Sequence, residues 1–357
     1  MKVLDRHLLG ELVKFTLLAL LSVVVIYLLI DLFEELNYFT SRKVSLFVII
    51  RYYLYSLPSA ISLLYPVSLL LAVFLVYGQL TRFRELHALQ SAGLTTYRLF
   101  VPGIGLGLVS VVSYLVGNEL VTIPFNRELS DLRRYVIERR AAPASPRRQN
   151  LYFVDGGRVL FAQEVEADTV MRGVTVIELG PDRRVVRRTD CPEIRFSDSA
   201  WTGACVVRSF DTSGAEHVVR MAQAPVNALT VRPADFFSPA RPVEETPTRA
   251  LWRYIQRMKR AGENVASEEV EFHYRFAYSL IGLIVVLLGL PLSVRLRSGG
   301  VMFGLGLGLL FSFLYWGAIQ TCRAYGTSHV VSPALAAWLP NIVFGLAALI
   351  LMVRVEQ

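Results

Sequence analysis

The sequence offers few residue combinations that do chemistry by themselves. It contains no phosphate-cradling GxxxxGKS or GxxxxGKT segment and no HExxH pair for zinc. Its five histidines are scattered and none stands at metal-ligand spacing from another: His7, His87, His217, His273 and His329. A Ser/His/Asp assembly stays open, because its members meet only in space. We therefore expect a chain that hydrolyses no nucleotide and binds no metal ion or cofactor of its own.

The cysteines offer one possible covalent link. Cys191 and Cys205 lie on neighbouring candidate strands of a hydrophilic block that we place in an oxidising compartment. A disulfide between them would stabilise the fold by about 3 kcal/mol on the loop-entropy account. Two free thiols are the alternative. Cys322, at the end of an apolar stretch, is most simply a packing residue.

The segment 80–100 is a short polar gap between two long apolar runs. Phe83, Leu86 and Leu89 recur at the spacing of one helix face, and Gly93 is placed to end that helix in a left-handed cap. Polar residues occupy the other faces: Arg82, Glu85, His87 and Gln90. Such a helix, over residues 81–93, can dock to a cytosolic partner. A solvated loop between two membrane spans is the alternative.

The elements that must position these residues are mostly membrane spans. The chain is 54% hydrophobic and 18% charged, which is too apolar for a soluble protein of 357 residues. Six apolar stretches are long enough to cross a bilayer as helices: 15–32, 57–77, 99–120, 276–294, 301–321 and 334–353. They form two groups of three around about 150 hydrophilic residues. Gly103 and Gly107, four apart, allow close helix contact in the third.

The centres of all six stretches lack Asp, Glu, Lys, Arg and His. Ion-coupled transporters usually need such groups inside the membrane as a relay. Since the chain has no nucleotide site either, a transport function would take its energy from a separate ATPase.

Charge near the span ends predicts the orientation. With both termini in the cytosol, nine Lys and Arg residues lie on the cytosolic side and four on the other, in short loops. The hydrophilic block then lies outside the cytosol. For a protein of a bacterial inner membrane, that compartment is the periplasm. The net charge of +8 suits contact with anionic lipid. No basic run is interleaved with aromatics, so nucleic acid is not an expected partner. The first span lacks a small-residue cleavage site, which predicts an uncleaved membrane anchor.

The hydrophilic block changes to a strand pattern. Seven candidate strands are short and regularly spaced: 151–154, 158–163, 170–179, 184–188, 193–196, 201–210 and 217–222. Turn residues such as Gly156-Gly157 and Pro181-Asp182 separate them. This pattern predicts a sandwich, jelly roll or related all-β domain. A helix should follow from an N-cap at Thr248 to Gly262.

Several local motifs resemble the LptF/LptG family, the permease subunits of the lipopolysaccharide transport complex. They are LDR at 4–6, RELHALQSAG at 84–93, the helix 248–262, LPLS at 290–293 and AWLPN at 337–341. The opening is closer to LptG than to LptF. The resemblance implies three spans (1–122, with the docking helix at 81–93), a periplasmic β-jellyroll-like domain with flanking helices (123–272) and three further spans (273–357).

The resemblance also implies a function. Two such permeases pair and are driven by a cytosolic LptB-type ATPase dimer that holds Mg-ATP, with an LptC-type single-span protein and a periplasmic bridge. Lipopolysaccharide would leave the outer leaflet of the inner membrane, enter between the two permeases and pass through the β-domain towards the outer membrane. Spans one and five would gate the cavity. Glu85 would sit in the ATPase groove, with further docking contacts from Arg82, Phe83, Leu86, Leu89 and Gln90.

One departure concerns the outer end of span one, which in the family often carries basic residues that face lipid phosphates. Here the acids Asp31, Glu34 and Glu35 precede the bases Arg42 and Lys43. We take these five, together with Arg323, as headgroup candidates; a divalent ion or the partner subunit could complete the contact. A solvated helix end is the alternative.

Two other classes of function compete. A non-transporting scaffold or signal-transmission protein with a periplasmic binding domain would have the same apolar stretches, although the four-span type inserts its domain after span one. A lipid-modifying membrane enzyme lacks a candidate nucleophile or metal cluster in the sequence.

Overall fold

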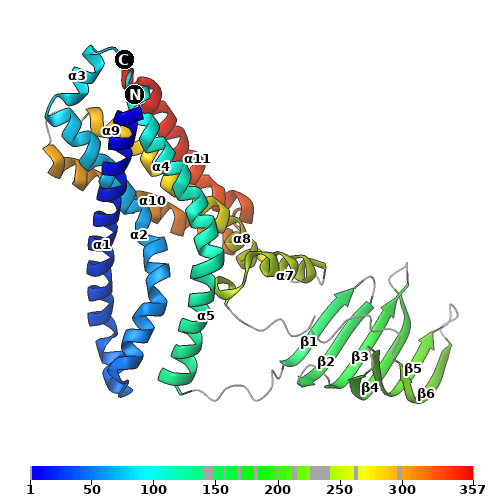
Figure 1. Ribbon diagram of the computed structural model, residues 1–357. Coiled ribbons are helices and arrows are strands. Elements are labelled where there is room, and N and C mark those ends of the chain that lie inside the picture. The colour runs from blue at the N-terminus through cyan, green and yellow to red at the C-terminus, as the bar shows by residue number, and fades with distance from the viewer. Residues whose placement is uncertain are drawn as a thin grey trace. The chain divides into compact units, whose positions relative to one another are not determined.

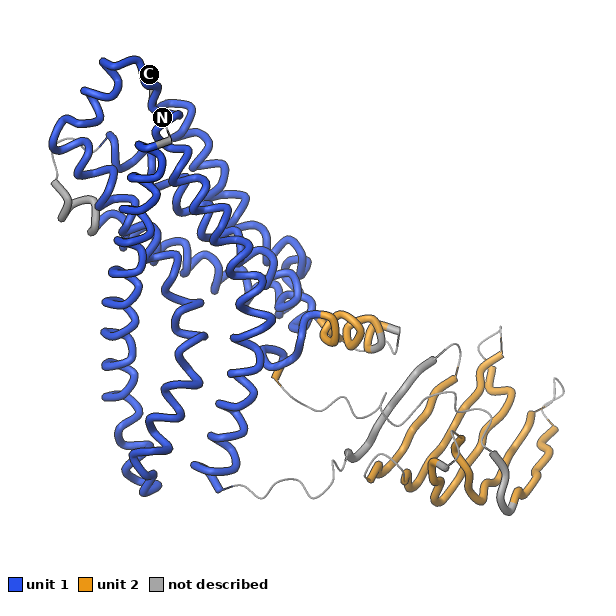
Figure 2. Tube along the Cα trace, viewed as in Figure 1, with its two compact units in different colours: residues 1–139, 243–248, 266–357 blue, residues 140–242, 249–265 orange. Residues whose placement is uncertain are grey.

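The computed structural model describes residues 2–139, 148–155, 158–166, 170–180, 184–197, 200–210, 215–225, 242–260, 264–295 and 300–356. The chain forms two compact units (Figure 2). The membrane unit comprises Met1–Arg139, Val243–Thr248 and Ala266–Gln357, and the β unit comprises Arg140–Pro242 and Arg249–Val265. The membrane unit thus includes the helices that follow the third apolar stretch, up to Ile137, which the sequence prediction counted among the helices flanking the β domain.

The membrane unit is entirely helical in its described residues (Figure 1). Its helices, in chain order, are α1 Lys2–Ser41, α2 Leu46–Arg82, α3 Glu85–Ser91, α4 Thr96–Gly117, the π-helix η1 Asn118–Thr122, α5 Ile123–Asp131, the π-helix η2 Leu132–Ile137, the short 3-10 turn η3 Val243–Glu245, α8 Ala266–Ser279, α9 Ile281–Arg295, α10 Gly300–Thr327, α11 Pro333–Val353 and the 3-10 turn η4 Arg354–Glu356.

Four helical runs of the described residues are long and apolar enough to cross a membrane: Val3–Ser41, Leu46–Arg82, Thr96–Ile137 and Pro333–Val353. The pair α8 and α9, bent by 41°, makes a fifth if it counts as one span. The predicted stretch 301–321 falls within α10, part of which lies outside the fully described residues; α10 is not among these runs, so the predicted count of six is not confirmed. The predicted stretch 57–77 is part of the longer helix α2, which begins at Leu46 and continues through Pro58 and Pro66.

Close packing against α9 organises the membrane unit. Val286 and Leu290 of α9 are fully buried. A methyl group added to Gly103 of α4 would lie 3.1 Å from Leu290 Cδ2, and one on Gly107 would lie 3.0 Å from Leu283 Cδ1. The absence of side chains at these two positions lets α4 approach α9 closely, as the spacing predicts.

The β unit contains one antiparallel sheet with strand order β1-β2-β3-β4-β5-β6. Its strands are β1 Arg148–Asp155, β2 Arg158–Glu166, β3 Val170–Leu179, β4 Val185–Ser197, β5 Ala200–Phe210 and β6 Glu216–Pro225. The segments 184–188 and 193–196, predicted as two strands, are joined in β4. Most of the turn residues predicted between strands, and the helix end at Gly262, lie outside the described residues.

The sheet topology does not confirm a jelly roll. A jelly roll folds two Greek keys into two sheets, whereas each described strand here pairs with its neighbour in sequence (Figure 1). Side chains of one face are buried, including Leu160, Val174, Val176 and Trp201. Alternation along the strands places the charged residues on the other face, where Arg172 lies within 3.4 Å of Glu193. The helix α7, Thr248–Arg260, follows the sheet in the chain, as predicted.

Candidate functional site

The segment predicted to dock a partner is broken into two pieces. α2 runs to Arg82, and α3 does not begin until Glu85. Between them Arg84 adopts φ 59°, a left-handed conformation that ends one helix and redirects the chain into the next. The single helix predicted over residues 81–93 is therefore wrong, because its pattern of side chains does not reveal a backbone turn at an arginine.

The predicted end of the docking helix is confirmed. Gly93 has φ 88°, its N–H donates to the Gln90 carbonyl at 2.9 Å, and the Leu94 N–H donates to the Leu89 carbonyl at 3.2 Å. This pair of bonds is the Schellman motif. Its left-handed residue is least strained when it has no Cβ, as in glycine.

The break at Arg84 divides the predicted apolar face. Phe83 is 64% exposed, whereas Leu86 is 1% exposed and Leu89 is half-buried. Leu86 therefore anchors α3 to its own protein and cannot contact a partner, which corrects its assignment to the docking face. The docking residues that remain exposed are Arg82, Phe83 and Glu85.

Gln90 also has an internal role. Its amide nitrogen donates to Thr96 Oγ1 at 3.1 Å, and its amide oxygen lies 3.1 Å from His87 Nδ1. Thr96 is buried in the first turn of α4. Gln90 thus links α3 to the helix that follows it.

The N-terminal turn of α4 contacts both the first helix, α1, and the last long helix, α11. Arg98 pairs with Asp5 of α1 at 2.5 Å, and the Tyr97 hydroxyl donates to the Met352 carbonyl of α11 at 3.0 Å. Consequently α3 lies at the end of the bundle where α1 begins and α11 ends (Figure 1). A partner that moves α3 therefore acts on a connected set of helices.

An apolar pocket of about 280 Å³ lies within the membrane unit. Its walls come from α1, α2, α8, α9 and α10, with Val23, Val67, Val285 and Phe313 among the lining residues. Ser312 also lines it, and its hydroxyl oxygen is buried with no hydrogen-bond partner in the described part of the chain. A hydrocarbon chain is the ligand chemistry that such walls suit. The sequence carries no signal for this pocket, since five separate helices must meet to form it.

The acids at the C-terminal end of α1 contact neighbouring side chains. The Tyr53 hydroxyl donates to Asp31 at 3.0 Å, and Arg133 of η2 lies 4.0 Å from Glu35. The guanidinium carbons of Arg133 and Arg42 lie 5.1 Å and 4.0 Å from the ring centre of Tyr38. The other two predicted residues of this end, Glu34 and Lys43, are exposed.

Arg323 does not pair with these acids. Its guanidinium lies 2.6 Å from Glu271 of α8 and over the ring of Tyr274. The predicted headgroup set is thus divided between two clusters. The sequence did not indicate Arg133, because it lies about 100 residues after Asp31. Only the packing of its helix against α1 brings it near these acids.

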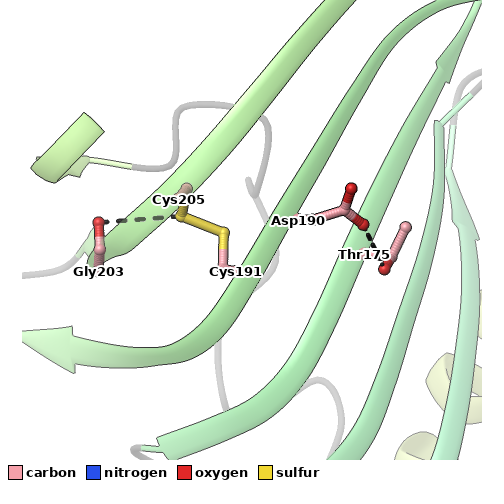
Figure 3. Close-up of a disulfide and its surroundings, with 5 residues drawn as sticks. All are labelled: Thr175, Asp190, Cys191, Gly203 and Cys205. Atoms are coloured by element: carbon pink, nitrogen blue, oxygen red, sulfur yellow. Dashed lines mark hydrogen bonds between the residues drawn. A yellow bond between two sulfur atoms is a disulfide. The ribbon is translucent and has the colours of Figure 1, made fainter. Parts of the chain in front are cut away.

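The β unit contains the disulfide left open by the sequence. Cys191 of β4 and Cys205 of β5 are bonded, and both are buried (Figure 3). The register of the two strands shifts here, between Asp190 and Ile194. A methyl group added to Gly203 would lie 2.5 Å from the Glu193 carbonyl, so only glycine fits this close approach.

No group of three or more His, Cys, Asp and Glu side chains in the described residues could hold a metal ion.

Comparison with known proteins assigns the family. A family model described as "Lipopolysaccharide export system permease LptF/LptG" matches residues 6–354. The chain is also similar to the lipopolysaccharide export system permease protein LptG of Escherichia coli K12, with 19% identity over 306 residues, covering 85% of this chain and 84% of that protein. The LptG of Escherichia coli O6:H1 strain CFT073 gives the same values. Because the family model spans nearly the whole chain, this protein belongs to the LptF/LptG family of lipopolysaccharide export permeases.

Proposed function

We propose that this chain is one of two paired permease subunits of an exporter driven by a separate cytosolic ATPase. It extracts lipopolysaccharide from the outer leaflet of the bacterial inner membrane and passes it through its periplasmic β unit towards the outer membrane. The sister subunit is of the LptF/LptG type, the ATPase is an LptB-type dimer that binds Mg-ATP, and an LptC-type protein with a periplasmic bridge takes the lipid onward. This chain supplies no nucleotide site.

The observation that carries this proposal is the geometry of α3. The buried Leu86, the Gly93 cap and the Gln90–Thr96 bond hold α3 in place, while Phe83 and Glu85 remain exposed. An exposed aromatic in the turn before a rigidly held helix, close in the chain to an exposed carboxylate in its first turn, suits a groove in a partner protein. The charge bias of the loops and the position of α3 beside both chain ends support a cytosolic location for this surface.

The pocket supports a lipid cargo. Its walls are apolar, it lies among helices of membrane-spanning length, and α1 and α10 both line it. We propose that an acyl chain of the cargo occupies it. For the headgroup, we propose that Arg133 and Arg42, which both lie over the Tyr38 ring, supply positive charge to lipid phosphates.

The docking surface can be tested with Phe83→Asp and Glu85→Arg. Both side chains are exposed, so the fold should survive, while co-purification of the ATPase and ATP-dependent lipid release should fall. Val3→Asp is the matched control, because Val3 is an exposed apolar residue near the same end of the bundle, outside α3. Normal ATPase recovery and normal lipid release by both docking variants would reject this surface.

A further inference from the structure

Six residues that follow the sheet in the chain belong to the membrane unit: Val243–Thr248, which we name the strap. The strap contains η3 and follows, along the chain, the segment that returns from the sheet. Whatever holds the strap therefore fixes the point at which the chain, on its way back from the sheet, rejoins the membrane unit.

Arg275 of α8 holds the strap along its length. Its Nη1 donates to the Thr246 carbonyl at 2.8 Å and to Thr248 Oγ1 at 3.0 Å, and its Nη2 donates to the Val243 carbonyl at 2.7 Å. The planar guanidinium can reach these three separated acceptors at once, which the single ammonium of a lysine cannot. Arg275 is only 4% exposed, so these bonds replace its hydration.

The helical run after α4 holds the strap from another side. The Glu119 carboxylate of η1 accepts from Thr248 Oγ1 at 2.7 Å and from the Thr248 N–H at 3.2 Å. Arg127 of α5 donates to the Glu245 carbonyl at 2.6 Å. Thr248 is thus not the N-cap that the sequence predicts: it is the first residue of α7, and a carboxylate distant in sequence caps that helix.

Glu271 connects this assembly to α10. One of its carboxylate oxygens lies 3.7 Å from Arg275 Nε, and the other lies 2.6 Å from Arg323 Nη2 of α10. Glu271 is 8% exposed. A buried carboxylate between two arginines adds little net stability, but loss of one partner leaves a buried charge uncompensated. Such an arrangement favours one relative position of the helices that carry it.

α10 is also a wall of the apolar pocket. Arg323 follows Ser312 by 11 residues, which is about three helical turns, so both lie on the same face of α10 about 16 Å apart. Movement of α10 as the pocket fills or empties would therefore move Arg323, and with it Glu271.

We propose that Arg275 is a positioning residue for lipid transfer, which holds the strap to α8 while Glu271 links the strap and α8 to Arg323 of α10. Movement of α10 is passed through this chain of contacts to the strap, which in the chain lies between the two parts of the β unit. The inference rests on the transport function proposed above, and it adds a route from the membrane pocket to the β unit.

The test uses the full complex, with sister permease and ATPase, in proteoliposomes that contain lipopolysaccharide. Arg275→Lys keeps the charge beside Glu271 and removes the three-way contact with the strap. We expect ATP hydrolysis to stay within about twofold of wild type, while lipid transfer per ATP falls about fivefold or more, as for the loss of charge-assisted hydrogen bonds. Hydrogen exchange at the Thr248 amide should become faster. Arg195→Lys, on an exposed side chain of β4, is the matched control and should change neither quantity.

A second variant tests the α10 side of the route. Arg323→Gln should also lower lipid transfer per ATP, without faster exchange at the strap. If the two substitutions act on one route, lipid transfer per ATP by the double variant should be no lower than that of the more impaired single variant. The proposal is overturned if Arg275→Lys transfers lipid normally, if hydrolysis and transfer fall in proportion, or if the two effects multiply. Failure of the wild-type complex to transfer lipid would instead reject the proposed function.

Discussion

Arg98 at the base of α4 forms an ion pair with Asp5 of α1, with 2.5 Å between Nη2 and Oδ2. The two residues are 93 positions apart, and their contact joins the helix after the docking segment to the first helix of the chain. Both side chains are about one-third exposed, at 33% and 36%, so solvent screens much of the attraction.

This exposure predicts a small effect on stability. Asp5→Asn should lower the free energy of unfolding by less than about 1 kcal/mol. We expect its effect on the efficiency of lipid release to be larger, because the pair joins α4, the helix that follows α3, to α1. Thermal unfolding and lipid release would be measured on the same preparation. The charge-reversed pair Asp5→Arg with Arg98→Asp should regain release, and unchanged release by Asp5→Asn would exclude the pair from coupling.

The disulfide should stabilise the β unit. Replacement of Cys191 and Cys205 together by alanine should lower its stability by about 3 kcal/mol, since the bridge closes a loop of 14 residues in the unfolded chain. Resistance of the β unit to proteolysis would report this loss. Cys322→Ala, at a free thiol in α10, is the control. Recovery of two alkylatable thiols from these positions in unreduced protein would contradict the bridge.

The pocket should be required for cargo rather than for folding. Val67→Phe adds bulk to the wall contributed by α2 and should lower the amount of lipid that co-purifies. Ser312→Ala removes a buried hydroxyl that has no partner in the described residues, so it should leave stability unchanged or raise it by about 1 kcal/mol. Lipid would be counted by native mass spectrometry. Unchanged lipid in Val67→Phe, with the complex intact, would show that the pocket is not a cargo site.

The proposed headgroup contact depends on the charged residues near the C-terminal end of α1. Arg133→Gln should reduce lipopolysaccharide binding, because it removes a positive charge from this cluster, where the guanidinium lies 4.0 Å from Glu35. Binding measured at low and high salt should show a weaker salt dependence in the variant. Arg187→Gln in the β unit is the control for loss of a paired surface arginine. Equal lipid binding by Arg133→Gln and wild type would show that Arg133 does not bind the headgroup.

The two faces of the sheet separate transport from a scaffold role. A photocrosslinking amino acid at Val176, on the buried apolar face, should capture lipid only when ATP is hydrolysed. The same probe at the adjacent Thr175 points to the opposite face, where its hydroxyl bonds Asp190, and should capture little. A scaffold that moves no lipid would give no ATP-dependent difference between the two positions.

Some features of the candidate site could be predicted because they depend on local chain geometry. A glycine at position 93 ends α3, since the left-handed cap needs a residue without a Cβ. The close approach of Gly103 and Gly107 to α9 follows from their spacing on one helix face.

Other features depended on contacts that no local pattern encodes. The left-handed turn at Arg84 separates Phe83 from Leu86, although both fit one helical face in the sequence. Arg323 carries a charge suitable for a lipid phosphate, yet it pairs with Glu271 because α8 and α10 pack together.

The sequence by itself determined which segments are apolar enough to cross a membrane, where the strands lie and which family the motifs resemble. These properties follow from side-chain period and hydropathy, which act over a few residues. Only the tertiary structure decided the single meandering sheet, the pocket shared by five helices and the attachment of the strap by Arg275. Each of these requires groups far apart in the chain to meet, and the free energy of such contacts is set by burial and geometry rather than by residue type alone.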